Sequence, residues 1–272
     1  MLTSVVCRAE HFRSDWFQRW RELVLVRSLA ISGGYKPELH RKHWEWCAIA
    51  QALWERRMLL PGRRGLGFAV GREPLPALFA GYGAEVVATD LAPSAQTADH
   101  WERAGQHASS LEQLYVEQLI EREAFDQRVR FQFADMSSDW DFEPASFDFV
   151  WSSCSFEHLG SLEAGLDFVV RSAKLLRPWG VAIHTTEYNV SSNDDTIDRG
   201  ETVLYRQRDI EDLDRRLRRQ GYCLARPDLF PGQEAPDRRY DVPPYDPEAG
   251  RDHVKLLIGD FVATSVLLIV LA

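Results

Sequence analysis

The stretch RRGLGFAVGREPLPALFAGYGAEVVATDL, residues 63–91, decides the fold of this chain. An apolar run over 65–70 ends at Gly71, a helix-forming segment follows over 75–80, and a second β-rich run ends in Asp90. This pattern predicts a strand, a tight glycine turn, a helix and a second strand. Glycines let a ligand approach the backbone closely, and a carboxylate at the next strand end can accept hydrogen bonds from ribose hydroxyls. The stretch therefore predicts a site for an adenosine-containing cofactor.

The spacing of the glycines distinguishes between two classes of cofactor. The dinucleotide fingerprint G-x-G-x-x-G would need its third glycine where Val70 stands, which disfavours a pyrophosphate ligand. Counted from Gly67, the sequence GFAVG resembles the G-x-G-x-G loop of class I S-adenosylmethionine-dependent methyltransferases, with Ala69 at the central glycine. The resemblance implies S-adenosyl-L-methionine as the cofactor.

The same resemblance implies which residues hold that cofactor. Family members usually carry an acidic residue two positions before the first glycine, where this chain has Gly65, and Glu73 is the nearest carboxylate that could replace it. Residues 129–135 alternate as a third strand does, and the residues at its end stand where the family reads the adenine ring. The implied cofactor-binding set is Gly67, Ala69, Gly71, Glu73, Asp90, Leu91, Asp135, Met136 and Ser153.

The most specific resemblance lies in SFDFVWSSCSFEHL, residues 146–159, which is similar to the family's fourth strand with its F-D-x-V run and E-H-L ending. An amphipathic helix over 162–176, an R-P-W-G turn at 177–180 and a strand over 181–186 follow in the family's order. The resemblance covers about residues 63–186. It implies a Rossmann-like α/β fold with a mostly parallel seven-stranded sheet, one antiparallel strand, helices on both faces and an N-terminal helical cap.

The remaining segments are assigned from periodicity and from turn-forming residues. We expect helices over 95–103, 109–123 and 208–220, and strands over 222–225, 253–259 and 261–271. Residues 227–252 contain many prolines and are expected to form a long loop or lid.

The N-terminal part is rich in tryptophan, and we expect residues 1–62 to form a helical cap on a methyltransferase domain at 63–272. Apolar residues at helical spacing predict two helices broken at 32–37. Their aromatic side chains are expected to pack in the core. In the alternative interpretation, the cations and aromatics of 40–46 close over a bound ligand, with Trp44 touching the substrate.

Composition limits the classes of partner. With 272 residues, 45% hydrophobic, a net charge of −9 and a pI of about 5.4, the chain has no overall basic field for nucleic acid or anionic lipid. The scattered cysteines lack metal-ligand spacing, so we expect no metal site. Their scatter also leads us to expect a reducing, cytoplasmic setting. The N-terminus lacks a continuous apolar run, and the apolar end at 261–272 is too short to cross a bilayer. We expect a small-molecule acceptor and no membrane partner; the oligomeric state stays open.

Methyl transfer from an activated sulfonium needs alignment of the acceptor and, for a hydroxyl, removal of a proton. His158 is the first candidate base and Glu187 a weaker one, whereas a role in holding the loop is the alternative for His158. Tyr188 and Asn189 follow the fifth strand, at the edge where open α/β sheets bind ligands, and are candidate substrate contacts. His184 lies within that strand and is expected to be a core histidine.

Three function hypotheses follow from these observations. The first is a methyltransferase that acts on a hydroxyl of a small molecule, such as a sugar, a polysaccharide or a natural-product precursor; N- or carboxyl-methylation is its alternative. The second is an NAD(P) oxidoreductase, which Val70 disfavours. The third is a non-catalytic nucleotide-binding module, which would be favoured if Gly65 abolished cofactor binding.

Overall fold

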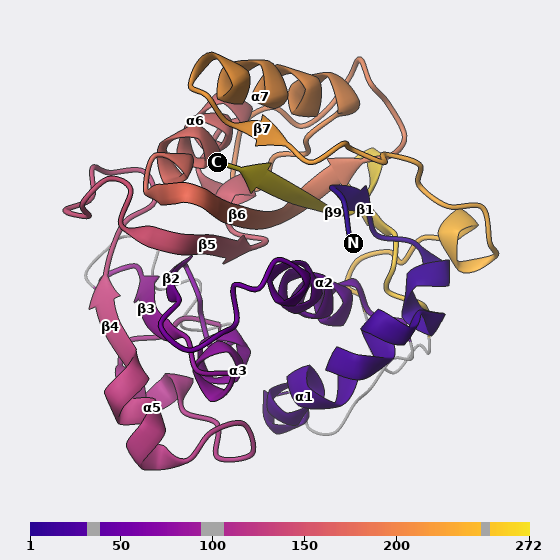
Figure 1. Cartoon of the computed structure of the whole chain (residues 1–272). Coiled ribbons are helices and arrows are strands. Elements are labelled where there is room, and N and C mark those ends of the chain that lie inside the picture. Colours follow the sequence, from indigo (N-terminus) through magenta and orange to yellow (C-terminus); the bar gives the residue numbers. More distant parts are fainter. Residues whose placement is uncertain (32–38, 94–105, 246–250) are drawn as a thin grey trace.

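A twisted nine-stranded β-sheet organises the computed structural model, which describes residues 1–31, 39–93, 106–245 and 251–272 (Figure 1). The parallel strands are β2 (Arg64–Phe68), β3 (Glu85–Asp90), β4 (Val129–Phe133), β5 (Phe147–Ser153) and β6 (Leu176–Asn189). The long strand β9 (Phe261–Leu271) runs antiparallel to β6 and also pairs with β1 (Val5–Val6), β7 (Cys223–Leu224) and β8 (Leu256–Ile258). The strand order is β1-β9-β6-β5-β2-β3-β4. The sheet is mostly parallel with an antiparallel strand, as expected, but it has nine strands instead of seven, because the short strands β1, β7 and β8 all pair with β9.

Helices cover both faces of the sheet (Figure 1). On one face lie α6 (Leu162–Ala173) and α7 (Gln207–Arg219); on the other lie α1 (Asp15–Ile31), α2 (Arg41–Glu55), α3 (Leu75–Gly81) and α5 (Arg122–Arg128). Successive side chains of a strand point to opposite faces, so Phe149 and Trp151 enter one core while Val150 enters the other. The result is a three-layer α/β/α arrangement.

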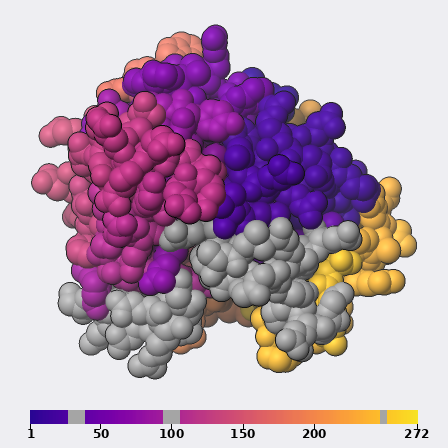
Figure 2. Space-filling view, turned by 90° about the horizontal axis from the view of Figure 1, so that it is seen from below, coloured from indigo at the N-terminus to yellow at the C-terminus, as the bar shows by residue number. Residues whose placement is uncertain are grey.

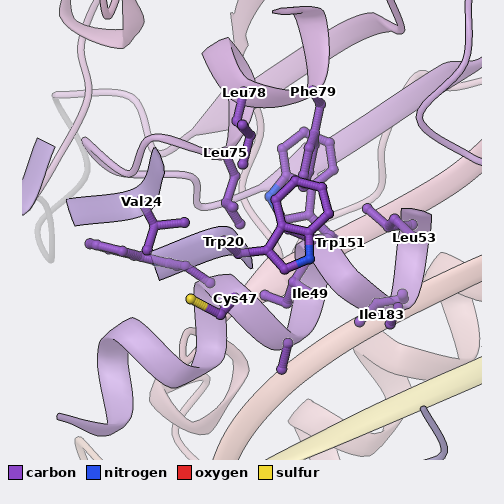
Figure 3. Packing of buried hydrophobic residues seen from close by; sticks show 14 of the residues in the cluster. Trp20, Val24, Cys47, Ile49, Leu53, Leu75, Leu78, Phe79, Trp151 and Ile183 are labelled. Carbon is purple, nitrogen blue, oxygen red and sulfur yellow. The ribbon is translucent and has the colours of Figure 1, made fainter. Parts of the chain in front are cut away.

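The tryptophan-rich helices pack as core elements (Figure 3). Trp20 of α1 is fully buried between α2 and α3, and its indole N–H donates to Gln51 Oε1 at 2.7 Å. Figure 2, a view from below, shows the indigo N-terminal residues lying beside the magenta residues that follow position 105. Since β1 pairs with β9, the first residues also extend the sheet. The boundary at residue 63 stays a prediction.

The expected helix over 109–123 is wrong. Only a 3-10 turn, Leu111–Leu114, forms there, and a helix begins at Arg122. The side chain of Gln113 accepts a hydrogen bond from Ser109 N at 2.7 Å, a local bond that competes with helix formation.

Several other boundaries shift by a few residues. The turn at 177–180 is an irregularity inside β6, which begins at Leu176, and the strand expected over 253–259 is shortened to β8. The expected strands over 85–90 and 261–271 are confirmed. The helix expected over 95–103 and the break at 32–37 lie outside the described residues.

Part of the expected lid is attached to the body of the protein. In its described part, 227–245, a 3-10 turn at Pro236–Arg238 positions Asp237, whose Oδ1 accepts a hydrogen bond from Ala9 N at 2.8 Å. Among the described helices, none has the length and hydropathy required to cross a bilayer.

Candidate active site

The turn that follows β2 is shaped by the neighbouring strands. Val70 N donates to Thr89 O at 3.0 Å, and the Thr89 hydroxyl donates to Gly67 O at 2.9 Å, so the turn is tied to the end of β3. A Cβ on Gly67 would lie 2.3 Å from the ring of Trp151, which explains the glycine. Ala69 and Gly71 have φ values of 48° and 53°, in the left-handed region. The turn therefore has a backbone conformation and a packing that favour small residues.

Asp90 connects this turn to the end of β3. Its Oδ2 accepts hydrogen bonds from Gly71 N and Ala108 N, both at 3.0 Å, and its Oδ1 accepts one from Leu91 N at 2.8 Å. The side chain is buried, and this burial raises its pKa, although the three backbone N–H groups act in the opposite direction. Asp90 thus lies against the turn, as the spacing of the two predicts.

Glu73 lies beside the same turn, on the side of β5. Its Oε1 accepts a hydrogen bond from the indole N–H of Trp151 at 2.8 Å, and the carboxyl is buried. Burial raises the pKa of Glu73 to about 8. The carboxyl is therefore largely protonated at neutral pH and can ionise when a cation approaches.

Asp135 and Met136 follow β4 at the edge of the sheet. Asp135 is exposed, and its Oδ1 accepts hydrogen bonds from Ser137 N at 2.8 Å and Ser137 Oγ at 2.6 Å. Met136 is buried in the core on the α6 side. The end of β4 is joined to that of β3, because Ala134 N donates to Asp90 O at 2.9 Å. All three strand ends lie at the carboxyl edge of the sheet, where α/β proteins bind ligands.

A buried polar cluster lies at the ends of β5 and β6, under the first turns of α2. Glu45 is at its centre: it pairs with Lys42 at 2.8 Å and Arg41 at 3.3 Å. Its other partners are the hydroxyls of Ser265, Ser153 and Thr185, at 2.5, 3.3 and 3.4 Å. Burial would raise the pKa of Glu45, but Lys42 and Arg41 outweigh it and hold that pKa at about 2.

Arg41 joins this cluster to Glu187. The guanidinium lies 2.5 Å from Glu187 Oε1 through Nη2, and its Nη1 lies 3.7 Å from Cys154 Sγ. Glu187 is 4% exposed, and burial raises its pKa although Arg41 opposes this. Glu157, fully buried, accepts a hydrogen bond from Thr186 Oγ1 at 3.0 Å. Ligand-type atoms of Cys154, Glu157 and Glu187 all lie within 4.8 Å of one another.

Some polar atoms of this cluster lack a hydrogen-bond partner among the described residues. They are Glu157 Oε1, Glu187 Oε2, Arg41 Nε and Ser155 Oγ. His158 Nε2 is 3.9 Å from Glu157 Oε1, within range of an ion pair but too far for a hydrogen bond. Because unsatisfied buried polar atoms are costly, such atoms at a strand-end edge point to a polar ligand.

The other residues expected in the site differ in how many hydrogen bonds they make to neighbouring loops. His158 Nδ1 lies 2.7 Å from Glu201 O, which leaves Nε2 directed toward Glu157. Asn189 orders the following loop, because its Oδ1 accepts from Ser191 N at 2.9 Å and its Nδ2 donates to Asp195 O at 3.1 Å. Tyr188 is 6% exposed within the core on the α6 side.

Two side chains are core residues by their contacts. Trp44 is fully buried, and its indole N–H donates to His11 Nδ1 at 3.0 Å, away from the strand ends. His184 is likewise buried and lies 2.8 Å from Ser152 Oγ and 3.1 Å from Ser172 Oγ; burial lowers its pKa to about 3. We therefore carry neither into the proposed mechanism.

The sequence offered the cations of 40–46 only as an alternative, and it missed Glu45 as the residue that joins them. Arg41 and Lys42 lie one turn before Glu45 on α2 and both pair with it, and Arg41 also pairs with Glu187 at the end of β6. The available signal was the run HRKHWEW at 40–46, whose charged residues interrupt an otherwise apolar helix. Glu157 appeared in the sequence analysis only as part of the E-H-L ending and was not assigned a role.

A glycine turn after the first parallel strand, an acidic residue ending the second and a sheet of this order define a Rossmann-like methyltransferase fold. A sequence profile described as a methyltransferase domain matches residues 66–184. The profile match and the fold together support an S-adenosylmethionine-dependent methyltransferase domain at residues 66–184.

Solved structures are similar at low sequence identity. A chain from the complex between the Haloferax volcanii Trm112 methyltransferase activator and a protein assigned as a methyltransferase is 16% identical, over 93% of this chain and 96% of that one, with a TM-score of 0.50. The Burkholderia thailandensis 1,6-didemethyltoxoflavin-N1-methyltransferase is 16% identical over 97% and 90%, with a TM-score of 0.47.

A Galdieria sulphuraria protein assigned as a sarcosine dimethylglycine methyltransferase is 17% identical over 66% of this chain, which spans only 61% of that protein, with a TM-score of 0.40. At such identities, likeness supports the fold alone. No curated protein matches the sequence significantly.

Proposed function

We propose that this methyltransferase transfers its methyl group to a hydroxyl of a small molecule, with a sugar, a polysaccharide or a natural-product precursor as the acceptor class. The observation that carries the proposal is the buried polar cluster at the ends of β5 and β6. Two carboxylate oxygens without a partner in the described part of the chain, Glu157 Oε1 and Glu187 Oε2, are hydrogen-bond acceptors, and a hydroxyl-bearing molecule supplies the donors.

The cofactor would be held along the neighbouring strand ends. The backbone of the glycine turn would lie against the methionine part, and Glu73 would ion-pair with its ammonium group in place of the acidic residue absent at Gly65. Asp90, already within hydrogen-bonding distance of Gly71 N, would accept from the ribose hydroxyls, with Leu91 beside it. Asp135, Met136 and Ser153 complete the cofactor set, the first two near the adenine and Ser153 near the methionine part.

A hydroxyl loses its proton as the methyl group is transferred, so the site needs a proton acceptor. Glu187 suits this task, because its raised pKa makes it a stronger base than an exposed carboxylate and its Oε2 is unpartnered. His158 is the second candidate, since its Nδ1 contact with Glu201 O orients Nε2 toward the cluster. Tyr188 and Asn189 belong to the acceptor side, Asn189 through the loop that it orders.

The experiment that tests this proposal is an acceptor screen with S-adenosylmethionine, read by release of S-adenosylhomocysteine. Each hydroxyl compound is paired with its O-methyl ether, which blocks the proposed site of transfer, and the product is analysed by NMR. Methyl groups found on oxygen in the product support the proposal. Transfer to nitrogen or to a carboxylate contradicts it, as does equal turnover of the blocked ethers.

Protein targets are a second candidate, on one observation: the charged α7 surface. Five arginines of α7, among them Arg215 and Arg219, could contact an acidic partner. However, Arg216 and Arg218 are engaged with Glu163, Asp212 and Asp214 at 2.6–2.8 Å, which favours a solvated helix face. A small-molecule acceptor remains the function that the site supports best.

A further inference from the structure

The buried cluster at the strand ends contains more negative charges than positive ones. Glu45 is neutralised by Lys42, and Glu187 by Arg41. Glu157 has neither Lys nor Arg within ion-pair distance among the described residues; its neighbour is His158 Nε2 at 3.9 Å. An ionised carboxylate that is fully buried is disfavoured without a close counter-charge, because burial removes its hydration, and Arg41 acts on Glu157 only from beyond ion-pair distance. The cluster therefore has room for one additional positive charge.

The carboxyl group of Glu157 lies at the strand ends where we propose that the acceptor binds. Glu157 follows β5 and Glu187 ends β6, and ligand-type oxygens of the two lie within 4.8 Å of each other. Each side chain keeps one oxygen without a hydrogen-bond partner among the described residues, and both side chains are more than nine-tenths buried. Two neighbouring carboxyl groups, each with an oxygen that lacks a partner among the described residues, can accept from two donors on adjacent atoms of one ligand.

From this geometry we propose that Glu157 binds an ammonium group of the methyl acceptor, next to the hydroxyl whose proton Glu187 receives. The inference rests on the proposed function and makes it more specific: the acceptor is a 1,2-amino alcohol, the chemical class that includes amino sugars. In the reaction, the hydroxyl oxygen bonds to the methyl carbon as the carbon–sulfur bond breaks. The sulfonium leaves as a neutral thioether, the proton passes to Glu187 Oε2, and the ammonium is unchanged.

A divalent metal ion is the competing cation, since Cys154, Glu157 and Glu187 could all be ligands. The position of Arg41 argues against it. Its guanidinium lies 2.5 Å from Glu187 Oε1 and 3.7 Å from Cys154 Sγ, so a doubly charged ion bound to these groups would lie beside a cation. Burial also raises the pKa of the Cys154 thiol, which disfavours the thiolate form that metals bind. A monovalent ammonium balances the charge with half of that repulsion.

The test is thermal unfolding of the full chain saturated with S-adenosylhomocysteine. Ethanolammonium chloride is the probe, compared at equal ionic strength with sodium chloride and with neutral N-acetylethanolamine. We expect a saturable rise in Tm of about 3 °C at ten times the Kd with ethanolammonium alone. This rise should vanish in Glu157→Gln, which keeps an oxygen for Thr186, and weaken several-fold in Glu187→Gln.

Glu163→Gln is the matched control, because Glu163 is an exposed glutamate of α6 that pairs with Arg216 at 2.6 Å. It should keep the full wild-type response to ethanolammonium. The proposal is overturned by equal effects of ethanolammonium and sodium on the wild type. It is also overturned if micromolar Zn²⁺ or Mn²⁺ gives a larger, Glu157-dependent rise, which would identify a metal site.

A third outcome concerns the cofactor, whose methionine part also carries an ammonium group. Calorimetry of S-adenosylmethionine binding should give the same Kd for Glu157→Gln and the wild type within about twofold. A tenfold loss would assign the pocket to the cofactor and overturn the proposal. Methylation of nitrogen in the acceptor screen, with the ethanolammonium response intact, would contradict the proposed O-methylation but leave the ammonium site standing.

Discussion

Single buried carboxylates give this site its chemistry, and each differs from the others through its neighbours. Glu45 faces two cations, and its pKa is held at about 2. Glu73 faces an indole N–H and an apolar surrounding, and its pKa is raised to about 8. Glu187 has a pKa raised by burial, with Arg41 acting in the opposite direction. The same residue type can therefore serve as a fixed anion, a switchable partner or a base.

The first residue-scale prediction concerns Glu73. At pH 7 its carboxyl is protonated in the free protein, so pairing with the cofactor's ammonium should release up to one proton. Glu73→Gln should abolish this release and weaken S-adenosylmethionine binding by about 10- to 100-fold, the worth of a charge-assisted hydrogen bond. Calorimetry in two buffers of different ionisation enthalpy measures both effects. The exposed Glu85→Gln serves as control, and undiminished proton release in Glu73→Gln would exclude this role.

Glu73 should also influence stability as the pH changes. The carboxyl deprotonates near pH 4.5 in the unfolded chain and near pH 8 in the folded protein, so the folded state holds the extra proton between these values. The contribution of Glu73 to the free energy of unfolding should therefore decrease as the pH rises from about 4.5 to 8. Urea unfolding across this range should give a flatter profile for Glu73→Gln than for the wild type.

The second residue-scale prediction separates the two candidate bases. Glu187→Gln should leave S-adenosylmethionine affinity nearly unchanged and lower kcat by roughly 10²–10⁴-fold, the usual contribution of general acid–base catalysis. The wild-type rate should rise with pH through the raised pKa of Glu187 and then level off, because only the carboxylate accepts a proton. His158→Ala should have a smaller effect, through the loop that its Nδ1 contacts. A larger loss of kcat in His158→Ala than in Glu187→Gln would identify His158 as the base.

At the scale of elements, the proposed cofactor site depends on a turn and the segment packed against it. The end of β2, the end of β3 and residues 106–108 meet at Gly71, whose N–H donates to Asp90. A Cβ on Gly71 would lie 2.3 Å from Gln106 O, so this position needs glycine both for its φ of 53° and for space. Backbone packing and ligand access therefore restrict the same position.

The element-scale prediction follows from this double restriction. Gly71→Val should abolish detectable S-adenosylmethionine binding and reduce the free energy of unfolding by about 1–3 kcal/mol, the cost of a strained backbone position. Gly62→Val is the matched control, because Gly62 has a φ of 81° and nothing within 4 Å of an added Cβ. It should share the backbone strain and retain binding. Equal binding by both variants would show the Gly71 turn to be structural only.

At the scale of the whole molecule, the N-terminal helices and the sheet share one core. Trp20, Leu53 and Phe79 belong to three different helices and pack in the same cluster as Trp151 of β5 (Figure 3). Arg41 and Glu45 extend this contact to the strand ends, so α2 carries both core and site residues. The N-terminal region is thus expected to unfold together with the sheet.

The whole-molecule prediction compares two tryptophans of adjacent helices. Trp20→Ala should destabilise the protein by about 3–5 kcal/mol, because a fully buried indole and its bond to Gln51 are lost. Trp54→Ala should cost less than about 1 kcal/mol, because its ring is 43% exposed and lies against Arg19. Urea denaturation followed by far-UV circular dichroism should show one transition in each variant. Separate transitions for the two halves would contradict the shared core.

The sequence alone determined the order in which the glycine turn, β3, β5 and β6 and the helices between them follow one another along the chain. Apolar periodicity and turn-forming residues act over a few neighbouring positions, so they can be read without the fold. The pairing of the glycine turn with Asp90 was predictable for the same reason, because one βαβ unit contains both. The helix predicted from local patterns at 109–123 was wrong. There the Gln113 side chain accepts a hydrogen bond from the backbone of Ser109, and this local bond competes with a regular helix.

Only the tertiary structure decided which charges meet. Arg41 and Glu187 are separated by most of the chain, yet they pair at 2.5 Å because α2 lies across the ends of β5 and β6. Whether Glu157 is neutralised depends on every side chain that surrounds it, and no spacing in the sequence contains that information. The same holds for Trp44, which the sequence left between core and ligand until its contact with His11 placed it in the core. Burial and charge balance are properties of the assembled layers, and they decide which residues of this chain can do chemistry.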